Sequence, residues 1–103
     1  MNPEAFLKLD RTIHEKGRMA IMSLLAATPE LSFTELRDTL KLTDGNLTTH
    51  IKKLQQAGYV GVTKSYSKNR PLTTCSLTKE GRKAFEEYLK VLEEIVQGHQ
   101  KEK

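Results

Sequence analysis

The centre of the chain reads SFTELRDTLKLTDGNLTTHIKKLQQAG from residue 32 to residue 58. Ser32 and Glu35 form a capping box, in which each side chain satisfies a backbone N–H of the other residue at a helix N-terminus. After a short break, Thr43 is a second candidate N-cap. Three aliphatic residues then recur at helical spacing on one face: Leu47, Ile51 and Leu54. Two short helices joined by about three residues are therefore predicted, with Leu42 as an apolar plug in the turn. This is the outline of a helix-turn-helix, and an ordinary helical hairpin is the alternative.

A β-hairpin is predicted directly after these helices. Gly58 takes the position after the helix C-terminus, where glycine is favoured. Residues 59–66 alternate and are rich in strand formers, residues 67–71 have the composition of a turn, and residues 72–77 form the return strand. A hairpin in this place is the wing of a winged helix-turn-helix.

Helices are also predicted at both ends of the chain. One is expected from Pro3 to about Leu9, and a central buried helix from about Ile13 to Thr28. Thr78 caps a last helix. The fold class is mainly α with a small β-hairpin wing (α+β), in one domain. Its parts are the N-terminal and core helices (3–28), the helix-turn-helix (32–57), the wing (59–77) and a C-terminal dimerisation helix (78–97).

The composition excludes several protein classes. With 103 residues there is room for one domain, and a single cysteine cannot form an internal disulfide. The longest nearly apolar run is about nine residues, from Met19 to Ala27, whereas a membrane helix needs about 20. No signal peptide is evident at the N-terminus. We therefore expect a cytoplasmic protein that has no contact with a membrane.

The positive charge is concentrated in the middle of the sequence. The net charge is +4, but residues 41–83 hold nine basic and two acidic residues, a charge of +7, which leaves −3 for the remainder. A basic middle with acidic ends is typical of a surface that binds a polyanion. Unevenly distributed, solvated lysines are the alternative interpretation.

Helical geometry predicts which side chains face DNA. With the apolar face inward, the N-terminal end of the second helix meets base edges, and its lysines meet phosphates. The predicted DNA-binding residues are Thr43, Asp44, Gly45, Asn46, Thr48, Thr49, Lys52 and Lys53 on the helix, and Lys64, Lys68, Asn69 and Arg70 on the wing. Arg70 is the candidate for the minor groove. Asp44 either accepts from cytosine or, as we favour, complements the helix dipole. We expect His50, at the edge of the buried face, to pack rather than to contact a base.

The last helix carries a stripe that is more apolar than a core of this size absorbs. A partner subunit would cover it, and folding back onto its own domain is the alternative. The predicted dimer interface consists of Phe6, Leu7, Phe85, Tyr88, Leu89, Leu92, Ile95 and Val96.

Four motifs, in order, resemble those of MarR- and ArsR-type winged-helix regulators. They are the core helix with Ile13, His14 and Arg18, the segment 32–36, the segment 47–54 followed by Gly58-Tyr59-Val60, and Leu77-Thr78-Lys79-Glu80-Gly81. The resemblance spans roughly Leu9 to Leu92. It implies homodimers formed through the terminal helices, a pseudo-palindromic DNA site and transcriptional regulation, most often repression. It also implies DNA contacts by Thr43, Asp44, Gly45, Thr48, Thr49 and Arg70. The chain differs in being shorter than full MarR proteins and in having Lys-Asn-Arg at the wing tip.

Other chemistry finds little support in the residues. Cys75 has no catalytic motif around it and is expected to be a half-buried strand residue, with a redox sensor as the alternative. His14, His50 and His99 are scattered along the chain. No metal, cofactor or catalytic activity is predicted, and whether an effector exists is left open. The predicted function is therefore a sequence-specific DNA-binding transcriptional regulator. The alternatives are a winged-helix protein-interaction module and a non-specific architectural DNA-binding protein. RNA binding is weaker still, because no exposed aromatic platform is evident.

Overall fold

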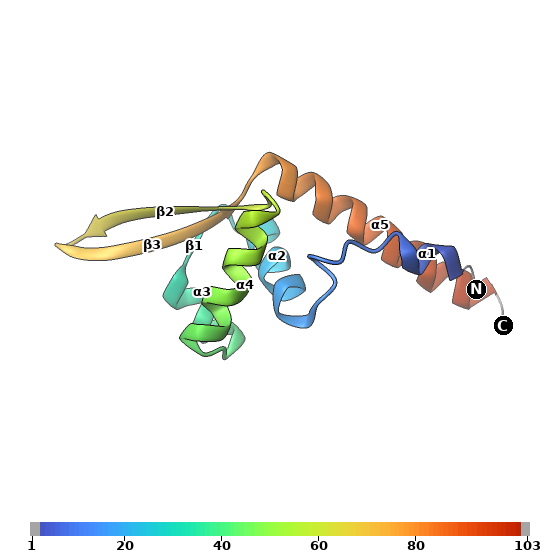
Figure 1. Cartoon of the computed structure of the whole chain (residues 1–103), viewed down its shortest axis with the longest axis horizontal. Coiled ribbons are helices and arrows are strands. Elements are labelled where there is room, and N and C mark those ends of the chain that lie inside the picture. Colours follow the sequence, from blue (N-terminus) through green and yellow to red (C-terminus); the bar gives the residue numbers. More distant parts are fainter. Residues whose placement is uncertain (1–2, 102–103) are drawn as a thin grey trace.

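The structure, a computed structural model, describes residues 3–101, with side chains up to residue 98. Its elements follow the order α1 (Pro3–Leu7), α2 (Lys16–Ala27), β1 (Leu31–Ser32), α3 (Phe33–Leu40), α4 (Asp44–Gln56), β2 (Val60–Ser67), β3 (Arg70–Leu77) and α5 (Lys79–Lys101). Figure 1 shows the β2–β3 hairpin projecting from one end of the molecule and α5 running toward the other, with α1 beside it. The predicted fold class, mainly helical with a small sheet, is confirmed.

The core lies where α2, α3, α4 and the base of the sheet meet. The buried side chains that form this core cluster are Ile13, Ile21, Met22, Leu25, Leu36, Leu47, Ile51, Leu54, Val60, Cys75, Phe85 and Tyr88. The middle of the predicted central helix contributes three of them, and the predicted inward face of α4 is confirmed in full. Leu42, in the turn, packs against this core as expected.

The caps of the helix-turn-helix are those that the sequence predicts. Ser32 Oγ accepts from the Glu35 N–H, and Glu35 Oε1 accepts from the Ser32 N–H, both at 3.0 Å. Thr43 Oγ1 accepts from the Asn46 N–H at 3.0 Å. Between the helices, Lys41 adopts a left-handed conformation (φ 55°), and the Leu42 N–H returns to the Arg37 carbonyl. These bonds satisfy helix-end groups that would otherwise lack partners.

The N-terminal helices are shorter than predicted. α1 ends at Leu7 rather than Leu9, and α2 begins at Lys16 rather than Ile13. The reason is Asp10, whose carboxylate accepts from the N–H groups of Thr12 and Ile13 and so closes a turn in place of a helix. The other carboxylate oxygen of Asp10 accepts from the Tyr59 hydroxyl, which ties this turn to the residue before β2.

The sheet differs from the prediction in two places. The two-residue strand β1 was not predicted; it pairs with Thr74 and Cys75 of β3, which gives the order β1-β3-β2. The hairpin tip consists of two residues, Lys68 and Asn69, in place of the predicted turn over residues 67–71. Both have positive φ (52° and 64°), the geometry whose twist matches that of paired strands.

The end of α4, the strands β2 and β3 and the start of α5 meet at one junction. Gly58 (φ 82°) ends α4 as predicted, with the N–H groups of Gly58 and Tyr59 bonded to the carbonyls of Gln55 and Leu54. The Tyr59 carbonyl accepts from the Thr78 N–H at 3.0 Å, and Thr78 Oγ1 caps α5 by accepting from the Gly81 N–H at 2.9 Å. A Cβ on Gly81 would lie 2.0 Å from the Tyr59 carbonyl oxygen. Only glycine therefore allows α5 to start so close to the sheet.

Some apolar residues of α5 are buried in the core of this chain, and others are exposed to solvent. Phe85 and Tyr88, which we predicted in a dimer interface, lie in the core of this chain and are 6% and 1% exposed. Val91, absent from that prediction, is also buried. Leu92 packs against the core, whereas Leu89 and Val96 are 47% and 54% exposed. The residues left for a partner are therefore fewer than predicted. Within residues 3–101, no helix combines the length and apolar character that crossing a bilayer requires.

We predict that Gly81→Ala destabilises the protein by about 3 kcal/mol, because backbone faces backbone and neither can move aside. Gly45→Ala, where nothing lies within 4 Å of the added Cβ, is the matched control and raises stability by about 0.5 kcal/mol. Urea unfolding followed by circular dichroism measures both, and equal stabilities would contradict the proposed close contact.

We also predict an alkaline dependence of stability. The hydrogen bond to Asp10, with burial and the Asp10 charge, raises the pKa of Tyr59 to about 12. Because this pKa is higher in the folded state than its usual value of about 10, the stabilisation is complete below pH 10 and is lost as the pH rises to 12. Tyr59→Phe should flatten the pH dependence of the unfolding free energy over this window, and Tyr66→Phe, an exposed tyrosine, should not.

Candidate DNA-binding surface

α4 presents one continuous polar face to solvent. Its exposed residues include every helix position predicted to contact DNA: Thr43 at the cap, then Asp44, Gly45, Asn46, Thr48, Thr49, Lys52 and Lys53. Apart from its chain neighbours and the backbone of its own helix, no atom lies within 4 Å of where a Cβ on Gly45 would stand, so the helix is open to close approach there. The face extends over the first turns of the helix, the part that meets base edges when a helix enters the major groove.

Two threonines on this face have restricted hydrogen-bonding roles. The Thr48 hydroxyl donates to the Asp44 carbonyl at 2.7 Å, and the Thr49 hydroxyl donates to the Gly45 carbonyl at 3.0 Å. Since the hydroxyl protons are used within the helix, each threonine offers solvent its oxygen lone pairs and its methyl group. Such groups can accept from the amino groups of cytosine or adenine and contact the thymine methyl.

The acidic residue on this face has a basic partner. Arg37 Nη1 of α3 lies 2.9 Å from Asp44 Oδ1, and Arg37 Nε lies 2.9 Å from Asp38 Oδ1. The hydrogen bonds to Asp38 and Asp44 raise the pKa of Arg37. Arg37 thus offsets the charge of a carboxylate that would otherwise repel phosphate. The sequence alone did not reveal Arg37, because seven residues and a turn separate it from Asp44.

His50 packs at the inner edge of α4, as expected from its position. Its Nδ1 lies 3.6 Å from Glu15 Oε1 and 3.4 Å from Arg18 Nη1. Burial would raise the pKa of Glu15, but the N–H of Arg18 and the charges of His50 and Arg18 outweigh it, so that pKa is lowered. These contacts join α4 to the start of α2. The other ring nitrogen, His50 Nε2, lies beside Gly17 of α2, where an added Cβ would be 2.6 Å from it.

A groove separates α4 from the wing. It has a volume of about 320 Å³, and Lys52 of α4 and Lys64 of β2 line it together with Thr48, Gln55 and Thr73. Lys64 pairs with Thr73, and Tyr66 pairs with Pro71, so these four residues share the face of the hairpin that Val62 and Cys75 occupy closer to the core. The structure therefore brings Lys52 and Lys64 together on one side of the recognition helix.

Arg70 lies elsewhere on the wing. It pairs with Ser67, directly after the Lys68–Asn69 tip, and by strand alternation it occupies the hairpin face opposite Lys64. Tyr66, which is 79% exposed, shares the Lys64 face near the tip and was not among the predicted contacts. The strand pattern could have found it, but the expected five-residue turn obscured the register.

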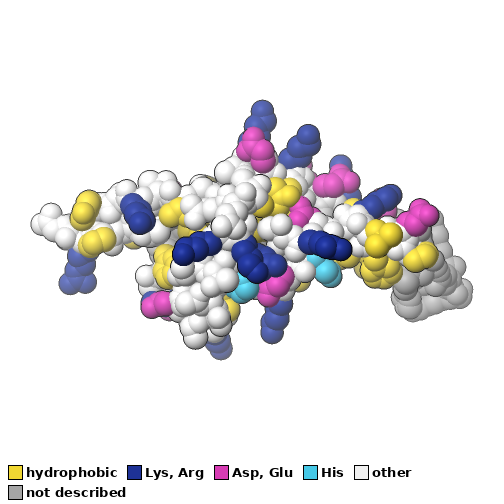
Figure 2. Space-filling model, in the orientation of Figure 1, with side chains coloured by type: hydrophobic (Ala, Val, Ile, Leu, Met, Phe, Trp, Pro, Cys, Tyr) yellow, Lys and Arg dark blue, Asp and Glu magenta, His cyan; other side chains and the backbone are white. Residues whose placement is uncertain are grey.

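The cations of this surface are uncompensated. No ion pair joins Lys52, Lys53, Lys64, Lys68 or Arg70 to any side chain that the structure describes. Figure 2 shows Lys and Arg side chains spaced along the visible face, from the wing across the middle of the molecule. Exposed cations, an exposed polar helix face and an open backbone at Gly45 are together the features of a surface that binds a phosphate-bearing polymer.

In the described part of the chain, no group of three His, Cys, Asp or Glu residues is placed to hold a metal ion. Cys75 lies in a strand as predicted, but it is fully buried (1% exposed) and not half-buried, and burial raises the pKa of its thiol. His14 Nδ1 is 2.8 Å from the Tyr88 hydroxyl, so His14 contacts α5, whereas His50 contacts the start of α2. The His99 side chain lies outside the described residues.

Known proteins are similar to this chain in sequence or in fold. The chain is 42% identical over 72 residues to an uncharacterized protein of Methanocaldococcus jannaschii, MJ0432, a match that covers 70% of this chain and 78% of that protein. The transcriptional regulator homologue protein from Pyrococcus horikoshii OT3 superposes with a TM-score of 0.84 at 27% identity, covering 92% of this chain and 93% of that one. A MepR mutant from a multidrug resistant S. aureus clinical isolate shares the fold, with a TM-score of 0.73 at 17% identity over 98% and 73% of the two chains.

The sequence also matches the winged helix DNA-binding domain family over residues 18–96, which includes the helix-turn-helix, the wing and most of α5. The predicted resemblance to winged-helix transcriptional regulators is confirmed by this match and by the solved structures. The chain belongs to the winged helix DNA-binding domain family.

Proposed function

We propose that this protein is a sequence-specific, homodimeric transcriptional regulator, most simply a repressor, that reads a pseudo-palindromic DNA site. The observation that carries the proposal is the exposed face of α4, where a row of polar side chains is flanked by cations that have no acidic partner within the described residues. α4 enters the major groove with its N-terminal turn toward the bases. Lys52 and Lys64 bind phosphates on the wing side.

The wing contributes the second contact. Lys68 and Asn69 form its tip, and the adjacent strands carry Tyr66 on one face and Arg70 on the other. A hairpin of this width presents both faces to the walls of a minor groove, so Arg70 takes one wall while Tyr66 contacts sugars on the other. An inserted arginine favours the narrow minor groove of A·T-rich DNA.

A second subunit accounts for the apolar surface at the α1–α5 end. Among the described large hydrophobic residues, Phe6 and Leu7 on α1 and Leu89 and Val96 on α5 are 44–86% exposed. α1 packs against α5, and Figure 2 shows hydrophobic side chains at that end of the molecule. Exposed apolar surface of this kind is favourable to cover, and a twofold axis there would place two copies of α4 for two half-sites.

Binding to fragmented genomic DNA at increasing salt, with the bound fragments sequenced, tests the function. We expect an enriched pseudo-palindrome whose half-sites are centred about one helical turn apart, roughly 34–36 Å, and a steep fall in affinity with salt. Binding without enrichment would indicate an architectural role. No binding at low salt would favour the protein-interaction module instead.

The dimer has a separate test. Leu89→Glu places a charge in the exposed apolar surface and should convert the dimer to monomers, as measured by analytical ultracentrifugation. Lys90→Glu, an exposed neighbour on the same helix, is the control and should remain dimeric. The same sedimentation coefficient for both variants would count against an interface on α5.

A further inference from the structure

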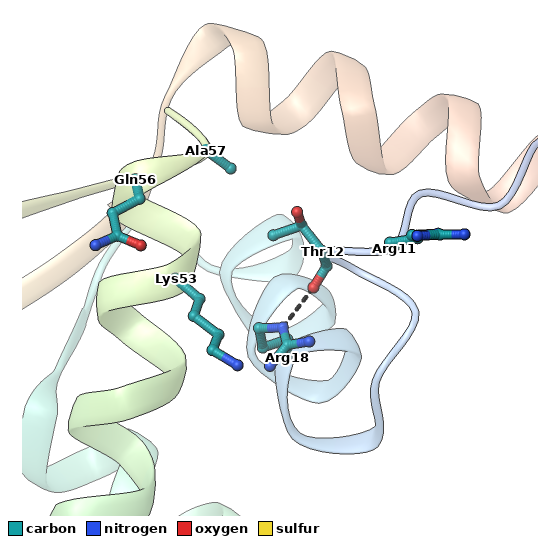
Figure 3. Close-up of a pocket in the computed structure, with 6 residues that line it drawn as sticks. All are labelled: Arg11, Thr12, Arg18, Lys53, Gln56 and Ala57. Carbon is teal, nitrogen blue, oxygen red and sulfur yellow. Dashed lines mark hydrogen bonds between the residues drawn. The ribbon is translucent and has the colours of Figure 1, made fainter.

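An open pocket lies on the side of α4 that faces α2 and the turn before it (Figure 3). It has a volume of about 360 Å³ and is lined by Arg11, Thr12, Arg18, Lys53, Gln56 and Ala57. Three of these residues are cations, and none of the six is a carboxylate. Of these, only Lys53 was among the predicted DNA contacts.

Arg18 is held in place inside this pocket. Its side chain is 12% exposed, and its Nε donates to the Thr12 carbonyl at 2.5 Å. Its Nη1 lies 3.4 Å from His50 Nδ1 and 4.0 Å from Glu15 Oε1, on the side away from the pocket lining. A guanidinium has five N–H donors, so these contacts fix its plane and leave further donors available to an anion.

Lys53 approaches the same space from α4. Figure 3 shows its side chain extending toward Arg18, whereas Arg11 points away from the pair and continues the positive charge toward α1. Lys53 forms no ion pair with a described side chain. Two like charges directed into one space repel each other, and an anion between them removes that repulsion.

The position of the pocket suggests the anion. The major groove is about 12 Å wide, so a helix lying in it has a phosphate backbone along each flank. Successive residues on a helix diverge by about 100°, and the neighbours Lys52 and Lys53 accordingly line different hollows, one toward the wing and one toward Arg18.

We propose that the pocket formed by Arg18, Lys53 and Gln56 binds a backbone phosphate of DNA, on the strand that runs along the flank of α4 opposite the wing. This inference rests on the proposed DNA-binding function. It makes α4 a helix clamped from both sides: Lys52 and Lys64 hold one strand and the pocket holds the other, with Arg11 adding charge beyond it.

The test compares salt slopes of binding to a double-stranded DNA fragment of random sequence. Lys53→Gln and Lys52→Gln should each reduce the slope by about 0.9 for each subunit that contacts the fragment, or about 1.8 for a dimer bound through both subunits, and the double variant by about twice that. Lys90→Gln removes an exposed charge from α5 and is the control, with an unchanged slope. If Lys52→Gln weakens binding and Lys53→Gln matches the control, the pocket is overturned while the proposed function stands. If the wild-type protein does not bind the fragment, both fail.

The arginine Nε–H signals in ¹⁵N NMR distinguish a DNA phosphate from a free one. The Arg18 signal should shift when the fragment is added, and the shift should be much smaller in Lys53→Gln. A shift with inorganic phosphate together with an unaltered DNA salt slope in Lys53→Gln would assign the pocket to a small free anion and overturn the backbone assignment. No Arg18 shift with either probe would overturn the site altogether.

Discussion

The carbonyl group of Tyr59 is the point on which the arrangement of this protein depends. It accepts from the Thr78 N–H, and Gly81 lies so close that a Cβ there would overlap the oxygen. Through this contact the end of the recognition helix, the two strands of the wing and the start of α5 are fixed relative to one another. The angle between α4 and the wing, and the direction in which α5 leaves the domain, follow from this packing of backbone against backbone.

That junction also links the DNA-binding surface to the α1–α5 end. α4 and the hairpin emerge on one side of it, and α5 carries its exposed apolar residues to the other end of a molecule 58 Å long. Close packing leaves little freedom between these parts, because interiors deform poorly. A partner bound along α5 would therefore set the separation of two α4 helices with the accuracy that half-site spacing demands.

Among the described residues, ion pairs neutralise the acidic side chains near this surface and leave its outward cations unpaired. Arg37 forms an ion pair with Asp44, while Glu15 contacts Arg18 and His50 on the inner side of α4. The outward cations keep no acidic partner among the described residues. Exposed ion pairs contribute little to the free energy of unfolding. Their main consequence here is electrostatic, because they determine which part of the surface attracts an anion.

Local sequence was sufficient for the helix-turn-helix and for most of the predicted DNA face. Capping at Ser32 and Thr43, the glycine at position 58 and the spacing of Leu47, Ile51 and Leu54 act over a few residues, so they can be recognised without the fold. Only the tertiary structure decided the rest. β1 exists because β3 passes beside it, and Arg70 faces away from Lys64 because pairing sets the register. Phe85 and Tyr88 belong to the core because the junction directs α5 across it. Arg18 and Lys53 line the same pocket only because α2 packs on α4. Each of these depends on contacts between segments far apart in the chain, which a local pattern does not encode.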